Sequence, residues 1–427
     1  MARPFFRLEL LSTLTFAVAL AMIEGGIISV FTKKTFHGVV SEGQLNFFVA
    51  FLGATPELAN ILSFIWSWKG QGKRKIPFIN ALQVATISLI ALLAIVPHSI
   101  FGLWLIVFLA LTARICWSGI ITIRPTVWRA NYSRAFRARV VARLSTGQML
   151  VAATLGIALG AMLDRNPDTY HLIVPAAGFI GLIAVWATSR LRVRRESRLL
   201  ALECSGSRAM TPWGSLAVVV RVLRNDPWYA RFMRCMFLLG VGNLMLTPIM
   251  VITLAEQFNA GYLKSILISS AIPALIMPLA LPIWTRLLDR AHVVRFRALH
   301  SWTFVAASIV LTIAVGFNIP WLLFVGAVLQ GIGFAGGTLA WNLGHVDFAP
   351  PSQTSQYMAT HVTLNGVRGL IAPFVAVFLY EAAKKAGLDA SLIVLLIASF
   401  MSMLGALGFV RLRAAMGPMI DQVSRTT

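Results

Sequence analysis

Two stretches of the chain, 218 residues apart, share one pattern. The first, Phe64–Phe78, reads FIWSWKGQGKRKIPF, and the second, Pro282–Phe296, reads PIWTRLLDRAHVVRF. Each places Ile-Trp and then Ser or Thr at the end of an apolar run, followed by a short basic segment and the next apolar run. Trp and basic residues are common wherever a chain leaves a membrane. Two copies separated by about half of the 427 residues nevertheless predict an internal repeat.

The composition excludes a large soluble protein. Hydrophobic residues make up 58% of the chain, charged residues only 12%, and the mean hydropathy is +0.79. A soluble protein of this length needs far more charge to cover its surface. In addition, the apolar residues form long runs instead of the spacing of amphipathic helices. The sequence therefore predicts an integral membrane protein.

Twelve apolar runs have the length of a membrane-spanning helix, which needs about 20 residues to cross a hydrocarbon core of about 30 Å. The longest polar stretch, residues 191–228, has six runs before it and six after it. We therefore expect an all-α integral membrane fold of twelve transmembrane helices in two six-helix bundles, residues 1–190 and 229–427, joined by a cytoplasmic central loop. The first run is too long for a cleaved signal peptide and lacks a cleavage pattern. The expected spans are residues 9–32, 44–67, 77–97, 101–123, 144–163, 171–190, 229–252, 263–285, 298–316, 320–344, 357–380 and 390–411.

The basic residues are distributed very unevenly. The chain has 37 Lys and Arg against 15 Asp and Glu, a net charge of +22. With the N-terminus placed in the cytoplasm, 29 of the Lys and Arg fall on the cytoplasmic side, six on the other side, and two, Arg114 and Arg368, inside spans. This is the positive-inside rule, and anionic lipid headgroups account for the excess. We expect a multi-pass protein of the cell (inner) membrane, with both termini cytoplasmic and no binding to nucleic acid.

The sequence contains no recognisable enzyme site. The three cysteines and seven histidines match no zinc spacing, and no catalytic triad or paired-carboxylate site is present. The run GIGFAGG at residues 331–337 lacks the Lys-Ser/Thr of a phosphate-binding loop. We therefore expect no enzymatic activity, no cofactor, no bound metal and no ATP-driven step. The oligomeric state is left open, and a monomer is compatible with the sequence.

The repeat resembles the major facilitator superfamily. That family has two six-helix bundles around a central site, and a motif of the form G-x-L-x-D-R-x-G-R follows its second helix. The second copy here, TRLLDRAHVVR, has Asp289 and Arg290 at the D-R positions, whereas the first, SWKGQGKR, has Gln71 in place of the aspartate. The drug-exporting branches carry R-x-x-Q-G on the fourth helix, and here RICWSG keeps Arg114 but has Trp117 and Ser118 in place of Gln-Gly. The resemblance implies a transporter in which Asp289 and Arg290 belong to a gating loop. The segment from the tenth to the eleventh run is also similar to superfamily members of magnetosome membranes, a branch linked to iron.

Five ionisable residues lie well inside the expected spans: Glu24, Glu57, Arg114, His361 and Arg368. A charged side chain at the bilayer centre is costly, so it usually faces a cavity or a partner and marks function. The third, sixth, ninth and twelfth spans have no such residue near mid-depth. The resemblance implies that those four helices face lipid and that the others line or flank the cavity.

The eleventh span carries a polar stripe. His361, Asn365 and Arg368 stand at i, i+4 and i+7, so they share one helix face. Two alternatives to substrate binding stay open. Arg368 could pair permanently with a carboxylate, and His361 could simply be hydrated near the cytoplasmic end. The predicted substrate-binding residues are Arg114, Asn243, Gln330, His361, Asn365 and Arg368.

Glu24 and Glu57 are the predicted proton carriers. A desolvated, unpaired carboxyl group holds its proton more tightly, and it can release that proton as access alternates between the two sides. The alternative is that each glutamate pairs permanently with Arg114 or Arg368 to form a neutral buried pair.

The sequence thus predicts a secondary active transporter of a small solute, proton-coupled as a symporter or an antiporter, that works by alternating access. The two arginines inside spans favour an anionic or polar solute of the drug or organic-anion type. One alternative is an iron or metal-chelate transporter of the same fold. Another, from a different class, is a membrane receptor or assembly protein that kept the fold and lost transport.

Overall fold

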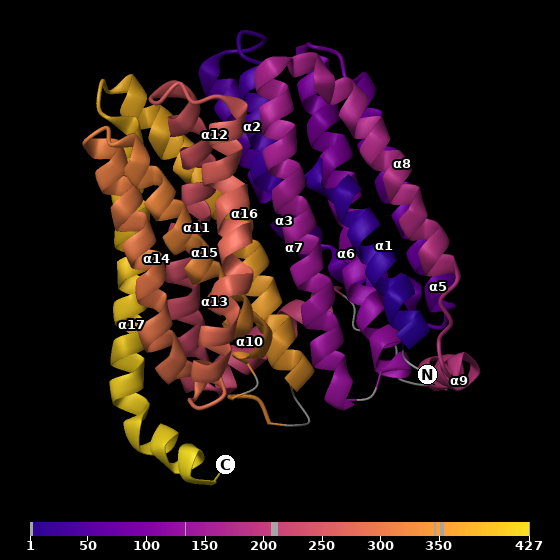
Figure 1. Ribbon diagram of the computed structural model, residues 1–427. Coiled ribbons are helices and arrows are strands. Elements are labelled where there is room, and N and C mark those ends of the chain that lie inside the picture. Colours follow the sequence, from indigo (N-terminus) through magenta and orange to yellow (C-terminus); the bar gives the residue numbers. More distant parts are fainter. Residues whose placement is uncertain (1–2, 133, 206–211, 346, 351–353, 427) are drawn as a thin grey trace. The chain divides into compact units, whose positions relative to one another are not determined.

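Long helices make up most of the described part of the chain, which divides into two units. The computed structural model describes residues 3–132, 134–205, 212–345, 347–350 and 354–426, and the part of the chain that it describes contains no β-strand. Unit 1 is Met1–Pro212 with Gly261–Ile266, and unit 2 is Trp213–Ala260 with Leu267–Thr427 (Figure 1). The predicted all-α fold is confirmed.

Unit 1 is built from long helices joined by short ones. Its elements are α1 (Arg3–Ala21), α2 (Gly25–Thr35), α3 (Glu42–Ile61), α4 (Ser63–Gly70), α5 (Lys75–Ala91), η1 (Leu92–Ile95), α6 (Ile100–Asn131), α7 (Arg134–Arg165), η2 (Pro167–Thr169), α8 (Tyr170–Ser189), α9 (Glu196–Ser205) and α12 (Tyr262–Ile266).

Unit 2 contains the remaining elements. They are α10 (Pro212–Asn225), α11 (Pro227–Glu256), the π-helical turn η3 (Leu267–Ala271), α13 (Ile272–Leu288), α14 (Val293–Gly316), α15 (Pro320–Leu343), α16 (Thr354–Lys385) and α17 (Ala390–Thr426).

Eleven helical stretches among the described residues are long and apolar enough to cross a membrane, against the twelve expected. The difference is the expected span 44–67, which consists of α3 and the short α4. α3 carries two glutamates and three amide side chains, and it ends at Ile61 before α4 begins. These polar groups and the break interrupt the continuous apolar run that the sequence predicts.

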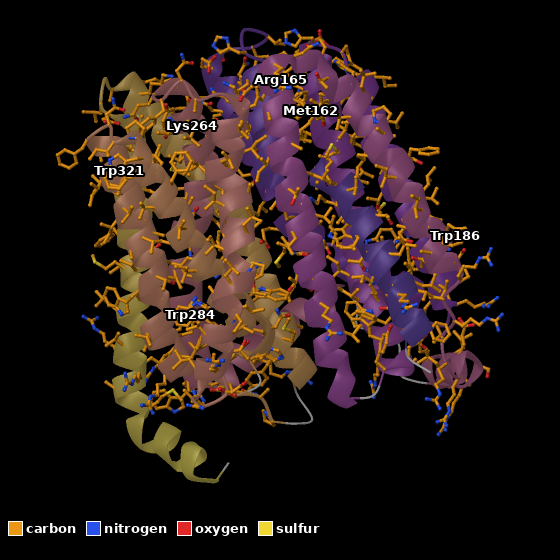
Figure 2. The ribbon with its side chains drawn as sticks, in the orientation of Figure 1. Met162, Arg165, Trp186, Lys264, Trp284 and Trp321 are labelled. Atoms are coloured by element: carbon orange, nitrogen blue, oxygen red, sulfur yellow. The ribbon has the colours of Figure 1, made fainter. Side chains whose placement is uncertain are left out.

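Each unit has an apolar outer face and a packed interior. Trp186 on α8 is 52% exposed and Trp321 on α15 is 66% exposed, and both point outward from their units (Figure 2). In the interiors, Phe16 of unit 1 and Phe232 of unit 2 are almost completely buried. Large apolar groups on the outside are unfavourable in water but match the hydrocarbon core of a membrane.

Local sequence signals fix where helices begin. Ser41 starts α3 with a capping box, in which its hydroxyl accepts from the backbone N–H of Gln44 and its own N–H donates to the Gln44 side chain. Asp226 caps α11, whose first residue is Pro227. These caps satisfy backbone donors that would otherwise lack partners, and they set the register of the helices that follow.

The repeat that the sequence predicts has a structural counterpart. Trp66 Nε1 donates to the carbonyl oxygen of Ile115 at 2.7 Å, and Trp284 Nε1 donates to that of Ile332 at 2.9 Å. The first bond joins α4 to α6 within unit 1, and the second joins α13 to α15 within unit 2. Each indole therefore ties the helix that contains Ile-Trp to a neighbouring long helix in the same way.

The segment expected to be a loop, residues 191–228, contains α9 and α10. α9 docks on the basic segment between α4 and α5 through Glu203. The Glu203 carboxylate accepts from the backbone N–H of Gly72 at 2.9 Å and from Lys75 Nζ at 2.6 Å, and its carbonyl oxygen accepts from Gln71 Nε2 at 3.1 Å. Glu203 thus supplies, from elsewhere in the chain, the carboxylate that the first copy of the motif lacks at Gln71.

We expect Glu203→Gln to destabilise unit 1. Lys75 is almost fully buried, and the change would leave its ammonium group without its carboxylate partner. A loss of about 2 kcal/mol in the free energy of unfolding is expected, measured by thermal or denaturant melting in detergent. The matched control is Glu196→Gln on the same helix, whose partner Arg74 is 70% exposed, so the change should stay within about 0.5 kcal/mol. Equal effects of the two substitutions would contradict the role given to Glu203.

Candidate functional site

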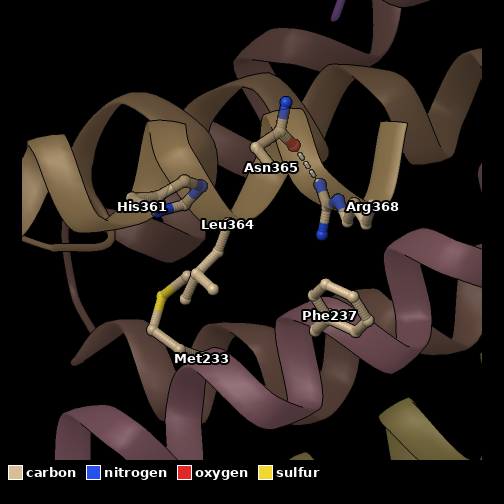
Figure 3. A pocket seen from close by; sticks show the side chains of 6 residues that line it. All are labelled: Met233, Phe237, His361, Leu364, Asn365 and Arg368. Carbon is tan, nitrogen blue, oxygen red and sulfur yellow. Dashed lines mark hydrogen bonds between the residues drawn. The ribbon is translucent and has the colours of Figure 1, made fainter. Parts of the chain in front are cut away.

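Unit 2 contains a small pocket between α11 and α16 (Figure 3). The space among its side chains is narrow. All three polar groups of the lining come from α16, whereas α11 contributes apolar groups. The lining residues are Met233, Phe237, His361, Leu364, Asn365 and Arg368.

The helical geometry of α16 brings the three polar groups together. The helix continues from Thr354 to Lys385 despite an internal proline, so residues four and seven positions apart share a face. His361 is 1% exposed and Asn365 is 7% exposed. The structure thus places His361, Asn365 and Arg368 in one pocket, as their spacing predicts.

Arg368 reaches from α16 to α11. Its Nη1 donates to the carbonyl oxygen of Met236, and its Nη2 donates to Asn365 Oδ1 (Figure 3). Gly240 on α11 makes room for this arrangement, because a Cβ at that position would overlap the guanidinium group. The glycine and the two hydrogen bonds therefore hold the guanidinium group at the edge of the pocket.

His361 is buried without a hydrogen-bond partner. Neither of its ring nitrogens makes a hydrogen bond within the part of the chain that the structure describes. Its ring meets that of Trp341 edge to face, with the centroids 5.9 Å apart. Buried polar groups are nearly always hydrogen-bonded, so a buried ring without a bond in the wall of a pocket is exceptional.

Arg297 and His300 on α14 form a buried polar pair of unit 2 that the sequence interpretation missed, and neither residue lines the pocket. Arg297 is 3% exposed, its Nη1 lies 3.3 Å from His300 Nδ1, and its Nε has no hydrogen bond among the described residues. His300 Nε2 lies 2.9 Å from the carbonyl oxygen of Gly333, which fits the tautomer that donates there and accepts from Arg297. Arg297 also interacts electrostatically with Arg368 and His361. Arg297 lies only four residues after the start of α14, so the sequence interpretation assigned it to a basic loop. The apolar residues on both sides of Arg297 could have indicated that it is buried.

Arg114 lies in unit 1, at a break in the first span. α1 ends at Ala21 and α2 begins at Gly25, and between them the carbonyl oxygen of Ile23 accepts from Arg114 Nη2 at 2.7 Å. The same nitrogen is 3.1 Å from Glu24 Oε2. The Arg114 side chain is 9% exposed and that of Glu24 is 47% exposed. This geometry supports the alternative in which Glu24 and Arg114 form a permanent pair.

The other predicted residues lie outside the pocket of unit 2. Glu57 in unit 1 accepts from Asn60 Nδ2 at 3.5 Å. Gln330 on α15 is 8% exposed, and Asn243 on α11 has a buried Oδ1 with no hydrogen bond within the described ranges. None of these three lines the pocket.

The predicted gating residues Asp289 and Arg290 are exposed at the end of α13. The acid that contacts the next helix is instead Asp347, whose Oδ2 accepts from the backbone N–H of Val293 at 2.7 Å and so caps α14. Nearby, burial lowers the pKa of His345, which leaves it neutral at physiological pH.

Glu9 and Arg124 form a second buried polar cluster in unit 1 that the sequence interpretation missed. Glu9 on α1 is 1% exposed, and its Oε2 accepts from Trp128 Nε1 at 2.7 Å. Arg124 on α6 is 9% exposed, interacts electrostatically with Glu9, and donates to Thr13 Oγ1 at 3.1 Å. Both charged groups stand close to the ends of their spans, where the sequence alone assigns them to an interface.

A comparison with protein-family models gives the family. The model of the Major Facilitator Superfamily matches residues 10–373. The chain belongs to the major facilitator superfamily. A search of curated proteins found no match.

Solved structures of transporters share the fold of this superfamily member. PepTSo, a transporter of the POT family, has a TM-score of 0.74 at 10% identity, with 97% of this chain and 98% of that chain covered. The nucleoside transporter NupG has a TM-score of 0.68 at 15% identity, with 96% and 98% covered. The xylose transporter XylE from E. coli, in a partially occluded inward-open conformation, has a TM-score of 0.67 at 10% identity, with 95% and 96% covered. At such identities the likeness shows the fold, a multi-pass membrane transporter fold, and not the substrate.

We expect Gly240→Ala to displace Arg368. The added methyl group occupies the place of the guanidinium group, so the bonds to Met236 and Asn365 are lost at a cost of about 1–2 kcal/mol in the free energy of unfolding. Melting in detergent measures the loss. In the Arg368→Ala background the same substitution should cost almost nothing, because the overlapping side chain is gone.

The control for this prediction is Gly53→Ala on α3, where a Cβ would meet no atom within 4 Å. It should be neutral or stabilising by up to about 1 kcal/mol, since alanine favours the helix. If Gly240→Ala costs the same with and without Arg368, the two positions are not coupled.

Proposed function

We propose that this superfamily member is a secondary active transporter that carries a small anionic solute across the membrane by alternating access. The observation that supports this most is Arg297. It is almost completely buried, and within the described residues its hydrogen-bond partner is the ring of a histidine and not a carboxylate. A buried charge without an opposite charge is costly. Arg297 does not line the pocket, but its charge acts on Arg368 and His361, so an anion bound there offsets part of this cost.

The pocket offers the groups that bind a carboxylate or a phosphate. Arg368 provides the planar guanidinium donors, Asn365 provides an amide, and His361 provides a ring N–H. The apolar groups of Met233 and Phe237 suit the hydrocarbon part of an organic anion. This combination favours the organic-anion type of solute over a neutral polar one.

Unit 1 supports the same proposal by contrast. Its buried arginine, Arg114, has Glu24 as an acidic partner at 3.1 Å, so it does not require an anion from outside. Glu24 and Glu57 could neutralise the two arginines that the sequence places inside spans. Arg297 of unit 2, which the sequence interpretation had not counted as buried, would still have no glutamate of this pair to neutralise it.

The alternatives are weaker on the same evidence. The basic groups of unit 2 repel a bare metal cation, so among metal-containing solutes only a negatively charged chelate suits the pocket. A receptor or assembly protein without transport has no need of a costly buried arginine and a buried histidine beside a pocket. Protons are the proposed coupling ion, and the positive-inside distribution supports a cytoplasmic position for both termini.

A thermal-shift measurement on the purified protein tests the solute class. The ligands are succinate, benzoate and inorganic phosphate, beside neutral sugars and cationic drugs. We expect anions to raise the melting temperature of the wild type, and their affinity for Arg368→Gln to fall at least about tenfold, because a charge-assisted hydrogen bond contributes about 1.5–3 kcal/mol. The control is Arg411→Gln, which changes an exposed arginine on α17 of the same unit and should bind as the wild type does.

Two outcomes would contradict the proposal. Stabilisation by neutral or cationic compounds alone would exclude an anionic solute, and equal effects of the two arginine substitutions would remove Arg368 from the site. Uptake of a stabilising anion into proteoliposomes then separates a transporter from a receptor that binds without transport.

A further inference from the structure

We propose that the pocket of unit 2 takes up its anion together with a proton, and that the ring of His361 carries this proton. The inference rests on the proposed function, because it takes an anionic solute as given. It differs from the sequence-based prediction, in which a carboxyl group, Glu24 or Glu57, is the proton carrier.

The starting observation is the environment of the His361 ring. The side chain is 1% exposed, it lines the pocket, and neither ring nitrogen has a hydrogen-bond partner among the described residues. A neutral imidazole has one N–H donor and one acceptor nitrogen, and burying both without partners is costly. A ligand that forms a hydrogen bond to the ring therefore removes part of this cost.

The protonated ring suits an anion better than the neutral ring does. The oxygens of an ionised carboxylate and the unprotonated oxygens of a phosphate accept hydrogen bonds and donate none, and the imidazolium ion donates from both nitrogens. The neutral ring offers such a ligand a single donor. Figure 3 shows His361 on the same helix face as Asn365 and Arg368, so an anion held by the guanidinium group lies in the pocket that the ring also lines.

The charges around the ring make proton and anion depend on each other. The charged and titratable groups that act on His361 are Arg368 on the same helix, Arg297 on α14 and His345 after α15. The lining from α11 is Met233 and Phe237, which carry no charge. A positive charge on the ring is repelled by the two guanidinium groups in a low-dielectric interior, and a bound anion supplies the opposite charge that offsets this repulsion.

Thermodynamic linkage then gives a coupled transporter. If the anion raises the affinity of the pocket for a proton by some factor, the proton raises its affinity for the anion by the same factor. The pocket is therefore occupied mainly by both or by neither, which is the condition for moving the two together in one direction. Symport of an anion with a proton follows from the placement of one histidine.

The test is isothermal titration calorimetry of the full-length protein in detergent, with succinate, benzoate and inorganic phosphate as probes. Each titration is run in two buffers that differ in their heat of ionisation, so that the number of protons taken up on binding is measured directly. We expect the wild type to take up close to one proton per bound anion. Above the range in which the free ring is protonated, its affinity should fall by about tenfold for each unit of pH.

The informative variant is His361→Gln, which keeps a side-chain donor without a titrating ring. We expect it to bind the same probe more weakly, with no proton uptake and an affinity that does not change with pH. The matched control is His37→Gln, because the His37 side chain is 74% exposed and lies in unit 1. It should retain the wild-type proton uptake.

Several outcomes would overturn the inference. Anion binding without proton uptake in the wild type refutes it and leaves the proposed anionic solute intact. Proton uptake that persists in His361→Gln and disappears in Glu57→Gln assigns the proton to the carboxyl group instead. If no probe binds the wild type, the proposed solute class fails, and this inference fails with it.

A second measurement does not depend on whether the variant folds. In the wild-type protein labelled with 15N at histidine, the ring nitrogen shifts distinguish the neutral ring from the imidazolium ion. We expect one histidine to change from neutral to protonated when succinate is added at constant pH. A spectrum in which every ring stays as it was, at a succinate concentration that saturates binding, would refute the proposal.

Discussion

The cost of placing a charge in hydrocarbon is the constraint on which the rest of this structure depends. A soluble protein can leave a charged side chain at its surface, but a helix within a membrane must give it a partner. Unit 1 meets this requirement with its own residues, since Arg114 has Glu24 and the carbonyl oxygen of Ile23, and Arg124 lies beside Glu9. Unit 2 buries Arg297 against a histidine. The two halves of one repeat therefore treat buried charge differently.

The break in the first span shows how the same constraint shapes the backbone. When a helix is interrupted inside a membrane, carbonyl groups lose their partners and must find new ones. The break between α1 and α2 is stabilised by Arg114, which binds both the freed carbonyl oxygen of Ile23 and the side chain at the start of the next helix. Arg114, which the sequence predicts to bind substrate, thus also stabilises the backbone of unit 1. In unit 2, α16 is continuous, so His361, Asn365 and Arg368 stay on one helix face, and this face lines the pocket.

The motif after the second span illustrates how a missing residue can be replaced from a distance. The first copy has Gln71 where the family pattern has an aspartate, and in the sequence this reads as the loss of an interaction. The structure returns a carboxylate to the same segment through Glu203 on α9. The second copy keeps Asp289 at its own position, but that side chain is exposed, and Asp347 caps the helix that follows. Each copy therefore recruits an acid from outside the motif.

The sequence by itself determined the membrane fold, the repeated Ile-Trp pattern and the polar face of α16. These follow from the length of the apolar runs, from the spacing of Trp66 and Trp284, and from the period of the helix. All three can be obtained from the sequence without knowing which helices pack together. Only the tertiary structure decided which charges have partners, because pairing depends on which helices pack together. It matched Arg114 with Glu24, buried Arg297 beyond a helix start that looks like a basic loop, and left His361 without a hydrogen bond in the described part of the chain. It also divided the second expected span into α3 and the short α4 at a break after Ile61.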